Sequence, residues 1–124
     1  LQEILRIREE AYRSRSPEYL RSIYSSDCPC LVNDERAIIE LLDHKHRWRG
    51  ISTAIEVRSV TRINDQLWIV VALLRSKALR IEKEDGRLIR IEPAGSDLFE
   101  FTLVKPRRTE QWLLGLVSDV EVRR

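Results

Sequence analysis

The sequence predicts an α+β domain in which three N-terminal helices pack on an antiparallel sheet of four to six strands. The spacing of apolar residues is helical as far as Gly50 and then alternates, which is typical of strands. Helices that all precede the strands indicate segregated layers, whereas alternating helices and strands would indicate a parallel sheet. The 124 residues contain neither a repeat nor a linker, so we expect one domain over residues 1–124.

Three segments carry the start and stop signals of helices. The first begins at Leu1, and a second, short helix opens at Ser16–Glu18, where serine caps and proline takes the first helical position. Either Asn33 or Asp34 caps a third helix, which Gly50 closes. Each segment has one apolar stripe, so we expect all three to bury that stripe against one face of the sheet.

Alternating or continuous apolar runs, separated by turns such as Glu84–Gly86, predict the strands. The runs at Trp68–Leu74 and Trp112–Val117 are apolar on both faces, although the helices can cover only one of them. We therefore expect another subunit, a further piece of the protein or a ligand on the second face. The strands are expected at residues 51–58, 66–82, 87–92, 97–105 and 111–122.

Two tryptophans stand out in these doubly apolar strands. A buried core position is the usual place for tryptophan, although the residue is also enriched at protein interfaces. The expected partner is a second copy of the chain or the rest of a longer parent chain. The residues expected at such an interface are Trp68, Val71, Leu73, Trp112 and Leu113.

Charge and hydropathy argue against two classes of partner. The formal net charge is only +2, with 20 acidic residues spread among 22 basic ones, which does not favour a nucleic-acid-binding surface. No run approaches the roughly 20 apolar residues that a membrane span needs. The chain contains no methionine and begins at Leu1 already in helical register, so we expect it to be a piece of a longer protein. A targeting or anchoring segment would then lie upstream.

Cys28 and Cys30 are the only cysteines and flank Pro29. A thioredoxin-type redox motif has two residues between its cysteines, whereas this pair has one. A zinc site needs further ligands, and the only histidines, His44 and His46, are expected to point about 200° apart on a helix. We therefore expect no metal site and no cofactor. The residues leave open whether the pair forms a disulfide or remains as two thiols.

The element order, together with the segments Ser16–Leu20 and Gln111–Leu114, resembles the nuclear transport factor 2-like, or SnoaL-like, superfamily. That resemblance implies a strongly curved sheet that encloses the helices as a cone. The segment Asp27–Leu31 is similar to one in actinobacterial domains of unassigned function that are attached to larger chains outside the membrane. It implies a Cys28–Cys30 disulfide and an extracytoplasmic or membrane-anchored location, with a cytoplasmic location as the alternative.

Proteins of this superfamily include isomerases, cyclases, dehydratases, transport adaptors and assembly domains, so the resemblance does not choose among functions. A ligand inside the cone would lie near Tyr12, Tyr24 and Phe101. No catalytic motif of the isomerases matches, and Asp97 is expected to cap a loop. Our first hypothesis is a non-catalytic interaction or sensory module. The alternative is a binder of a small hydrophobic ligand, or a SnoaL-like isomerase or cyclase.

Overall fold

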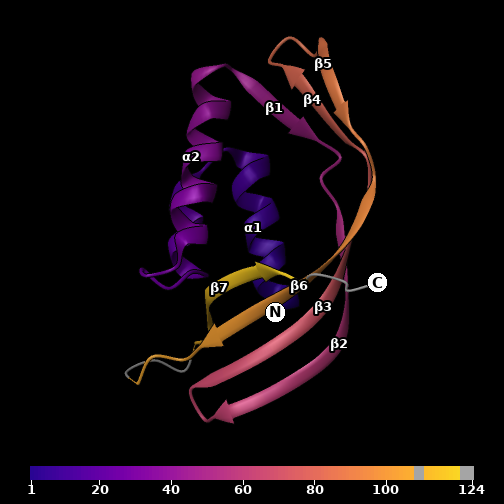
Figure 1. Ribbon diagram of the computed structural model, residues 1–124. Coiled ribbons are helices and arrows are strands. Elements are labelled where there is room, and N and C mark those ends of the chain that lie inside the picture. Colours follow the sequence, from indigo (N-terminus) through magenta and orange to yellow (C-terminus); the bar gives the residue numbers. More distant parts are fainter. Residues whose placement is uncertain (108–110, 121–124) are drawn as a thin grey trace.

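The computed structural model describes residues 1–107 and 111–120, and it confirms the α+β class: helices pack on strongly curved antiparallel sheets. Figure 1 shows α1 and α2 together on one side of the strands, inside the curve. The helical elements are α1 (Gln2–Ser14), the 3-10 helix η1 (Pro17–Ser22) and α2 (Pro29–Asp43). The strands are β1 (His46–Arg49), β2 (Thr53–Asn64), β3 (Leu67–Ser76), β4 (Leu79–Lys83), β5 (Leu88–Glu92), β6 (Gly95–Val104) and β7 (Leu113–Asp119).

The expected second helix is present as a 3-10 helix of six residues. Pro17 occupies its first turn, as the sequence predicts. The helix α1 ends where Arg15 takes a left-handed conformation (φ 54°), which turns the chain into η1. Backbone hydrogen bonds between residues 23–25 and Leu114 then tie the end of η1 to the edge of β7. These contacts fix the position of Tyr24.

The predicted bounds of the third helix are wrong at both ends. The helix α2 begins at Pro29, with Cys28 as its N-cap, so Asn33 and Asp34 lie within the helix. It ends at Asp43 because Lys45 takes a left-handed conformation (φ 56°). Residues 46–49 leave the helix and form strand β1, where pairing with β4 satisfies their backbone groups.

The strands form two sheets, not one. The larger has the order β2-β3-β6-β7 and the smaller β1-β4-β5. The run expected as one strand over residues 66–82 divides between them, because the chain leaves β3 at Ser76 and re-enters as β4 at Leu79. Figure 1 shows the β4–β5 hairpin at one end of the curve and the β2–β3 hairpin at the other.

The apolar core lies between the helices and the inner face of the larger sheet. Register places the side chains of Val70, Ala72, Phe101, Leu103 and Leu114 on this inner face, and all of them are buried. Alternation along each strand then places the intervening residues on the opposite, outer face. The helical contribution to the core comes from Ile4, Leu5, Ala11, Tyr12, Leu20, Ile23, Ile38 and Leu41.

Within the described ranges, none of the helices combines the length and the apolar character that crossing a bilayer requires.

Candidate functional site

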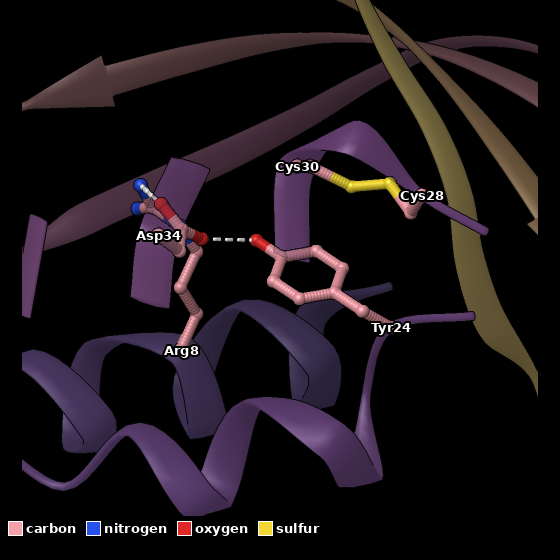
Figure 2. Close-up of a disulfide and its surroundings, with 5 residues drawn as sticks. All are labelled: Arg8, Tyr24, Cys28, Cys30 and Asp34. Atoms are coloured by element: carbon pink, nitrogen blue, oxygen red, sulfur yellow. Dashed lines mark hydrogen bonds and ion pairs between the residues drawn. A yellow bond between two sulfur atoms is a disulfide. The ribbon is translucent and has the colours of Figure 1, made fainter. Parts of the chain in front are cut away.

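Asp34 is a carboxylate buried at the centre of the helical layer, with 8% of its surface exposed. Arg8 of α1 forms a two-pronged ion pair with it: Nε lies 2.8 Å from Oδ2 and Nη2 lies 3.0 Å from Oδ1. Tyr12 donates its hydroxyl to Oδ1 at 2.6 Å, and Tyr24 donates to Oδ2. Figure 2 shows the contacts of Asp34 with Arg8 and Tyr24. Four donor groups therefore occupy both oxygens of one carboxylate.

These contacts determine the charge state of the cluster. Burial alone would raise the pKa of Asp34, but the hydrogen bonds and positive charge of Arg8, with the two tyrosine hydroxyls, hold that pKa below its usual range. Burial, and the neighbouring carboxylate, raise the pKa of both Tyr12 and Tyr24, although Arg8 opposes this. At neutral pH Asp34 is thus ionised and both tyrosines remain protonated donors.

Aromatic contacts hold the cluster in place. The Tyr12 ring stacks on Trp48 of β1, with centroids 4.4 Å apart and planes within 11°. The Arg8 guanidinium lies 4.9 Å from the centroid of the Tyr12 ring. Arg8 and Tyr12 are four residues apart on α1 and so share one face of that helix. The position of the donors is therefore fixed by packing as well as by hydrogen bonds.

A pocket of about 400 Å³ adjoins this cluster, between the helices and the inner face of the larger sheet. Arg8, Tyr24 and Asp34 form part of its wall, so the ion pair borders the pocket. The other lining residues are apolar (Leu5, Leu74, Phe99, Phe101, Leu114 and Val117), polar (Cys30, Asn33, Thr53 and Ser76) or acidic (Glu9 and Asp97). Such a mixture of apolar walls and a few polar groups is typical of small-molecule sites.

Cys28 and Cys30 form a close pair at the start of α2. Their Cα atoms are 5.2 Å apart, and the two sulfur atoms lie within bonding distance, as in a disulfide (Figure 2). The pair lies beside the Tyr24 ring (Figure 2). Cys28 is buried, whereas Cys30 is half-buried and lines the pocket.

The structure separates the residues that the sequence singled out for ligand binding. Tyr24 and Phe101 line the pocket. Tyr12 is buried beneath Asp34, with 2% of its surface exposed, and does not line the pocket. Asp97, expected to cap a loop, lies within β6 and is exposed at the pocket.

The residues expected at an interface lie on two different faces. Trp68 and Trp112 pack against the core, with ring centroids 5.1 Å apart, so the expectation of tryptophan on the outer face is wrong. The physical reason is register, because Trp68 pairs with Leu103 and both point inward. Val71, Leu73 and Leu113 lie on the outer face, opposite Glu100, Leu98 and Val104.

Sequence reasoning missed Asp34 and Arg8 as a pair. Asp34 follows the pattern of a helix cap, so its polarity had a local explanation. The available signal was the four-residue spacing of Arg8 and Tyr12, which places two donors on one helical face. Nothing local indicates that an acid 26 residues after Arg8 meets them.

The histidines do not lie as expected. Because Lys45 ends the helix, the rings of His44 and His46 stack with centroids 5.5 Å apart, and do not point in different directions. Within residues 1–107 and 111–120, the side chains form no group of three or more histidine, cysteine or acidic residues suited to a metal ion.

Comparisons with known proteins identify the fold. No family model matches the chain, and no curated protein matches it. The intermembrane space region of the chloroplast protein ARC6 matches with a TM-score of 0.76 and 12% identity, over 98% of this chain and 94% of that one. An NTF2-like protein of unknown function in nutrient uptake from Rhodospirillum rubrum matches with a TM-score of 0.57 and 11% identity, over 97% and 98% of the two chains.

A putative scytalone dehydratase from Novosphingobium aromaticivorans also matches, with a TM-score of 0.59 and 15% identity, over 98% of this chain and 86% of that one. All three identities are low enough that the likeness concerns the fold alone. The chain therefore has the nuclear transport factor 2-like fold that the sequence predicts.

Proposed function

We propose that this domain is a non-catalytic interaction module that associates with a second copy of itself through the outer face of the sheet β2-β3-β6-β7. The observation that carries the proposal is an apolar patch on that face, where Figure 1 shows no helix. Register places Thr102 and Glu100 of β6 on this face together with a set of apolar residues. We define the outer patch by those apolar residues: Leu67, Ile69, Val71 and Leu73 of β3, Leu98 and Val104 of β6, and Leu113 and Leu116 of β7.

One charged side chain, Glu100 of β6, lies on the outer face among the residues of the outer patch, opposite Val71. In a two-fold dimer each residue near the axis meets its own copy, so an uncharged centre avoids like-charge repulsion. The four outer-face positions of β3 are all apolar, so a two-fold axis at β3, and not at Glu100 of β6, meets this condition. Glu56, at the margin, already pairs with Arg58 and Arg75 at 3.2 Å each within the chain.

The Asp34 cluster supports the non-catalytic part of the proposal. An isomerase of the ketosteroid type needs a carboxylate free to accept a proton, and donors free to stabilise the developing oxyanion. Here Arg8, Tyr12 and Tyr24 already occupy the carboxylate, and both tyrosine hydroxyls donate to it. A cluster saturated in this way stabilises the fold, and its own carboxylate is not free to accept a proton.

Matched valine substitutions test the outer patch. Val71→Asp places a charge in the patch, whereas Val57→Asp places the same charge on the inner side of the edge strand β2, where Val57 is 51% exposed. We expect Val71→Asp, and independently Leu113→Asp, to weaken dimerisation by at least about tenfold, because each would bury two charges in an apolar contact. Val57→Asp should dimerise as the unmodified chain does.

Sedimentation equilibrium measures the dimer dissociation constant of each variant, and thermal unfolding shows whether the variant is folded. A folded Val71→Asp protein that dimerises as tightly as the Val57→Asp protein would contradict the proposal.

A second candidate, a binder of a small hydrophobic ligand, is favoured by the pocket of about 400 Å³ with its apolar walls. Native mass spectrometry of the purified chain would show such a ligand as added mass. Leu74→Trp would fill part of the pocket and remove the added mass if this candidate is right. If the purified chain shows no added mass and no set of apolar compounds raises its unfolding temperature, the ligand-binding candidate is wrong.

We further propose an extracytoplasmic location, with attachment to a longer parent chain. The close pair of Cys28 and Cys30 supports this, because disulfides persist in oxidising compartments. A similar fold occurs in a region that lies in an intermembrane space. Protein purified without reductant should take up no alkylating agent until it is reduced, and then take up two groups. Two groups added before reduction would contradict the proposal.

A further inference from the structure

The Cys28–Cys30 pair is accessible from one side only. Cys30 is half-buried and lines the pocket between the helices and the larger sheet. Cys28 is 1% exposed and belongs to the apolar core. A reagent that enters the pocket therefore reaches Cys30 and not Cys28.

We propose that Cys28 and Cys30 form a thiol–disulfide exchange site in which a small thiol enters the pocket and attacks the sulfur of Cys30. In this step the thiolate of the incoming molecule forms a bond to Sγ of Cys30, the Cys28–Cys30 bond breaks, and Cys28 leaves as a thiolate. A second thiol then displaces the first from Cys30. The two incoming thiols are oxidised to a disulfide and the protein pair is reduced to two thiols.

The position of the pair in α2 favours Cys28 as the leaving group. Cys28 is the N-cap of α2 and Pro29 is its first residue, so the leaving sulfur lies at the positive end of the helix dipole. The helix dipole stabilises a thiolate at such a position and offsets part of the free energy that forming it in the apolar core requires. The ring closed by the pair spans only three residues, so the disulfide adds little chain-entropy stabilisation that reduction would have to overcome.

The exchange has a consequence for the pocket. Cys30 lies in the first turn of α2, and Asn33 and Asp34, which line the same pocket, lie in the next turn. Reduction removes the link between the N-cap and the first turn, and it leaves a thiol at the pocket wall. This inference concerns the pocket and is independent of the proposed dimer contact on the outer face.

Single-cysteine variants test which sulfur the pocket exposes. Cys28→Ser leaves Cys30 as the only thiol, and Cys30→Ser leaves Cys28. In the folded proteins we expect iodoacetamide to modify Cys30 at least about tenfold faster than Cys28, with equal rates in denaturant, because access governs the difference. Equal rates in the folded proteins, or faster modification of Cys28, would overturn the proposal.

The unmodified protein provides a test that does not depend on those variants. Oxidised protein incubated with glutathione and quenched in acid should carry the mixed disulfide on Cys30, located by fragmentation of the peptide that contains both cysteines. Mixed disulfide found on Cys28, or found equally on both, would contradict the assignment. A pair that stays reduced in a buffer of oxidised glutathione would also contradict the proposal.

A pair of threonine substitutions on β2 tests the route through the pocket. Thr53 lines the pocket, whereas Thr61 pairs with Ile69 on the outer face of the same strand. Thr53→Trp should slow glutathione attack on Cys30 several-fold, because the indole would occupy part of the approach. Thr61→Trp should not change the rate. Equal rates in the two variants would contradict entry through the pocket.

Discussion

At Asp34, two tyrosine hydroxyls and one guanidinium converge on a single buried carboxylate. Removing its charge should leave Arg8 without its counter-ion and the hydroxyls with a poorer acceptor. We therefore expect Asp34→Asn to lower the free energy of unfolding by about 3 kcal/mol, the range typical of breaking a buried ion pair. Urea unfolding measures this.

The neighbouring residue provides the control for this substitution. Glu35 meets Arg21 at 3.5 Å, where the Arg21 side chain is 77% exposed. Glu35→Gln should change the free energy of unfolding by less than about 0.5 kcal/mol, because exposed ion pairs contribute little. Equal losses in the Asp34 and Glu35 variants would show that the Asp34 cluster is not a centre of stability.

The pKa of Asp34 also determines how stability depends on pH. Because this pKa is lower in the folded chain than in the unfolded chain, the folded state holds the proton less tightly. Ionised Asp34 makes its full contribution to the free energy of unfolding above its unfolded-state pKa of about 3.9. That contribution is lost as the pH falls through its lower folded-state pKa. We expect the free energy of unfolding to fall on acidification below about pH 4. If urea unfolding gives Asp34→Asn the same acid dependence as the unmodified chain, Asp34 is not the group responsible.

At the scale of elements, the β4–β5 hairpin depends on one backbone conformation. Gly86 has φ +90°, and its amide donates to the Lys83 carbonyl at 2.9 Å. No atom would contact an added Cβ, so a substitution acts through the backbone alone. Gly86→Ala should cost about 1–2 kcal/mol of unfolding free energy in a thermal or urea melt.

Gly95 is the matched control for that hairpin. It begins β6, has no positive φ, and also has open space around an added Cβ. Gly95→Ala should be within about 0.5 kcal/mol of the unmodified chain, or slightly more stable. If Gly86→Ala and Gly95→Ala lower the free energy of unfolding equally, the left-handed turn at Gly86 is not what positions β5.

The elements that the sequence predicts correctly are those with a local cause. The change of period after Gly50, the helix start at Ser16–Pro17 and the turn at Glu84–Gly86 depend on residues close in the chain, although the Ser16 side chain makes no capping hydrogen bond. Strand β1 was missed because its stability comes from pairing with β4, more than 30 residues away. A basic segment after an apolar helix has the local pattern of a helix end, and tertiary pairing overrides it.

The residues of the candidate site also divide into those that the sequence predicts and those that it does not. The resemblance implies a cone with Tyr24 and Phe101 near any ligand inside it, and both residues line the pocket. Asp34 was not expected there, because its partners come from another helix and from the segment after η1. The face on which Trp68 lies depends on strand register, which a run apolar on both faces does not determine.

At the scale of the whole molecule, the helices lie inside the curve of the sheet, and no helix or strand of residues 1–107 and 111–120 forms a layer over the outer patch (Figure 1). The buried carboxylate is paired, the pocket lies inside the curve and the unpaired apolar surface lies outside it. This arrangement supports a module that binds through its outside and that uses its buried ion pair for stability. The outer patch is therefore the feature on which the account depends most.

The most direct test is the molar mass of the unmodified chain and of Val71→Asp, measured in solution over a range of concentrations. The chain weighs 14.6 kDa. We expect the unmodified chain to approach twice that mass as its concentration rises, and Val71→Asp to remain near the mass of one chain while still folded. An unmodified chain that stays monomeric at high concentration, or a Val71→Asp protein that dimerises equally well, would contradict the account.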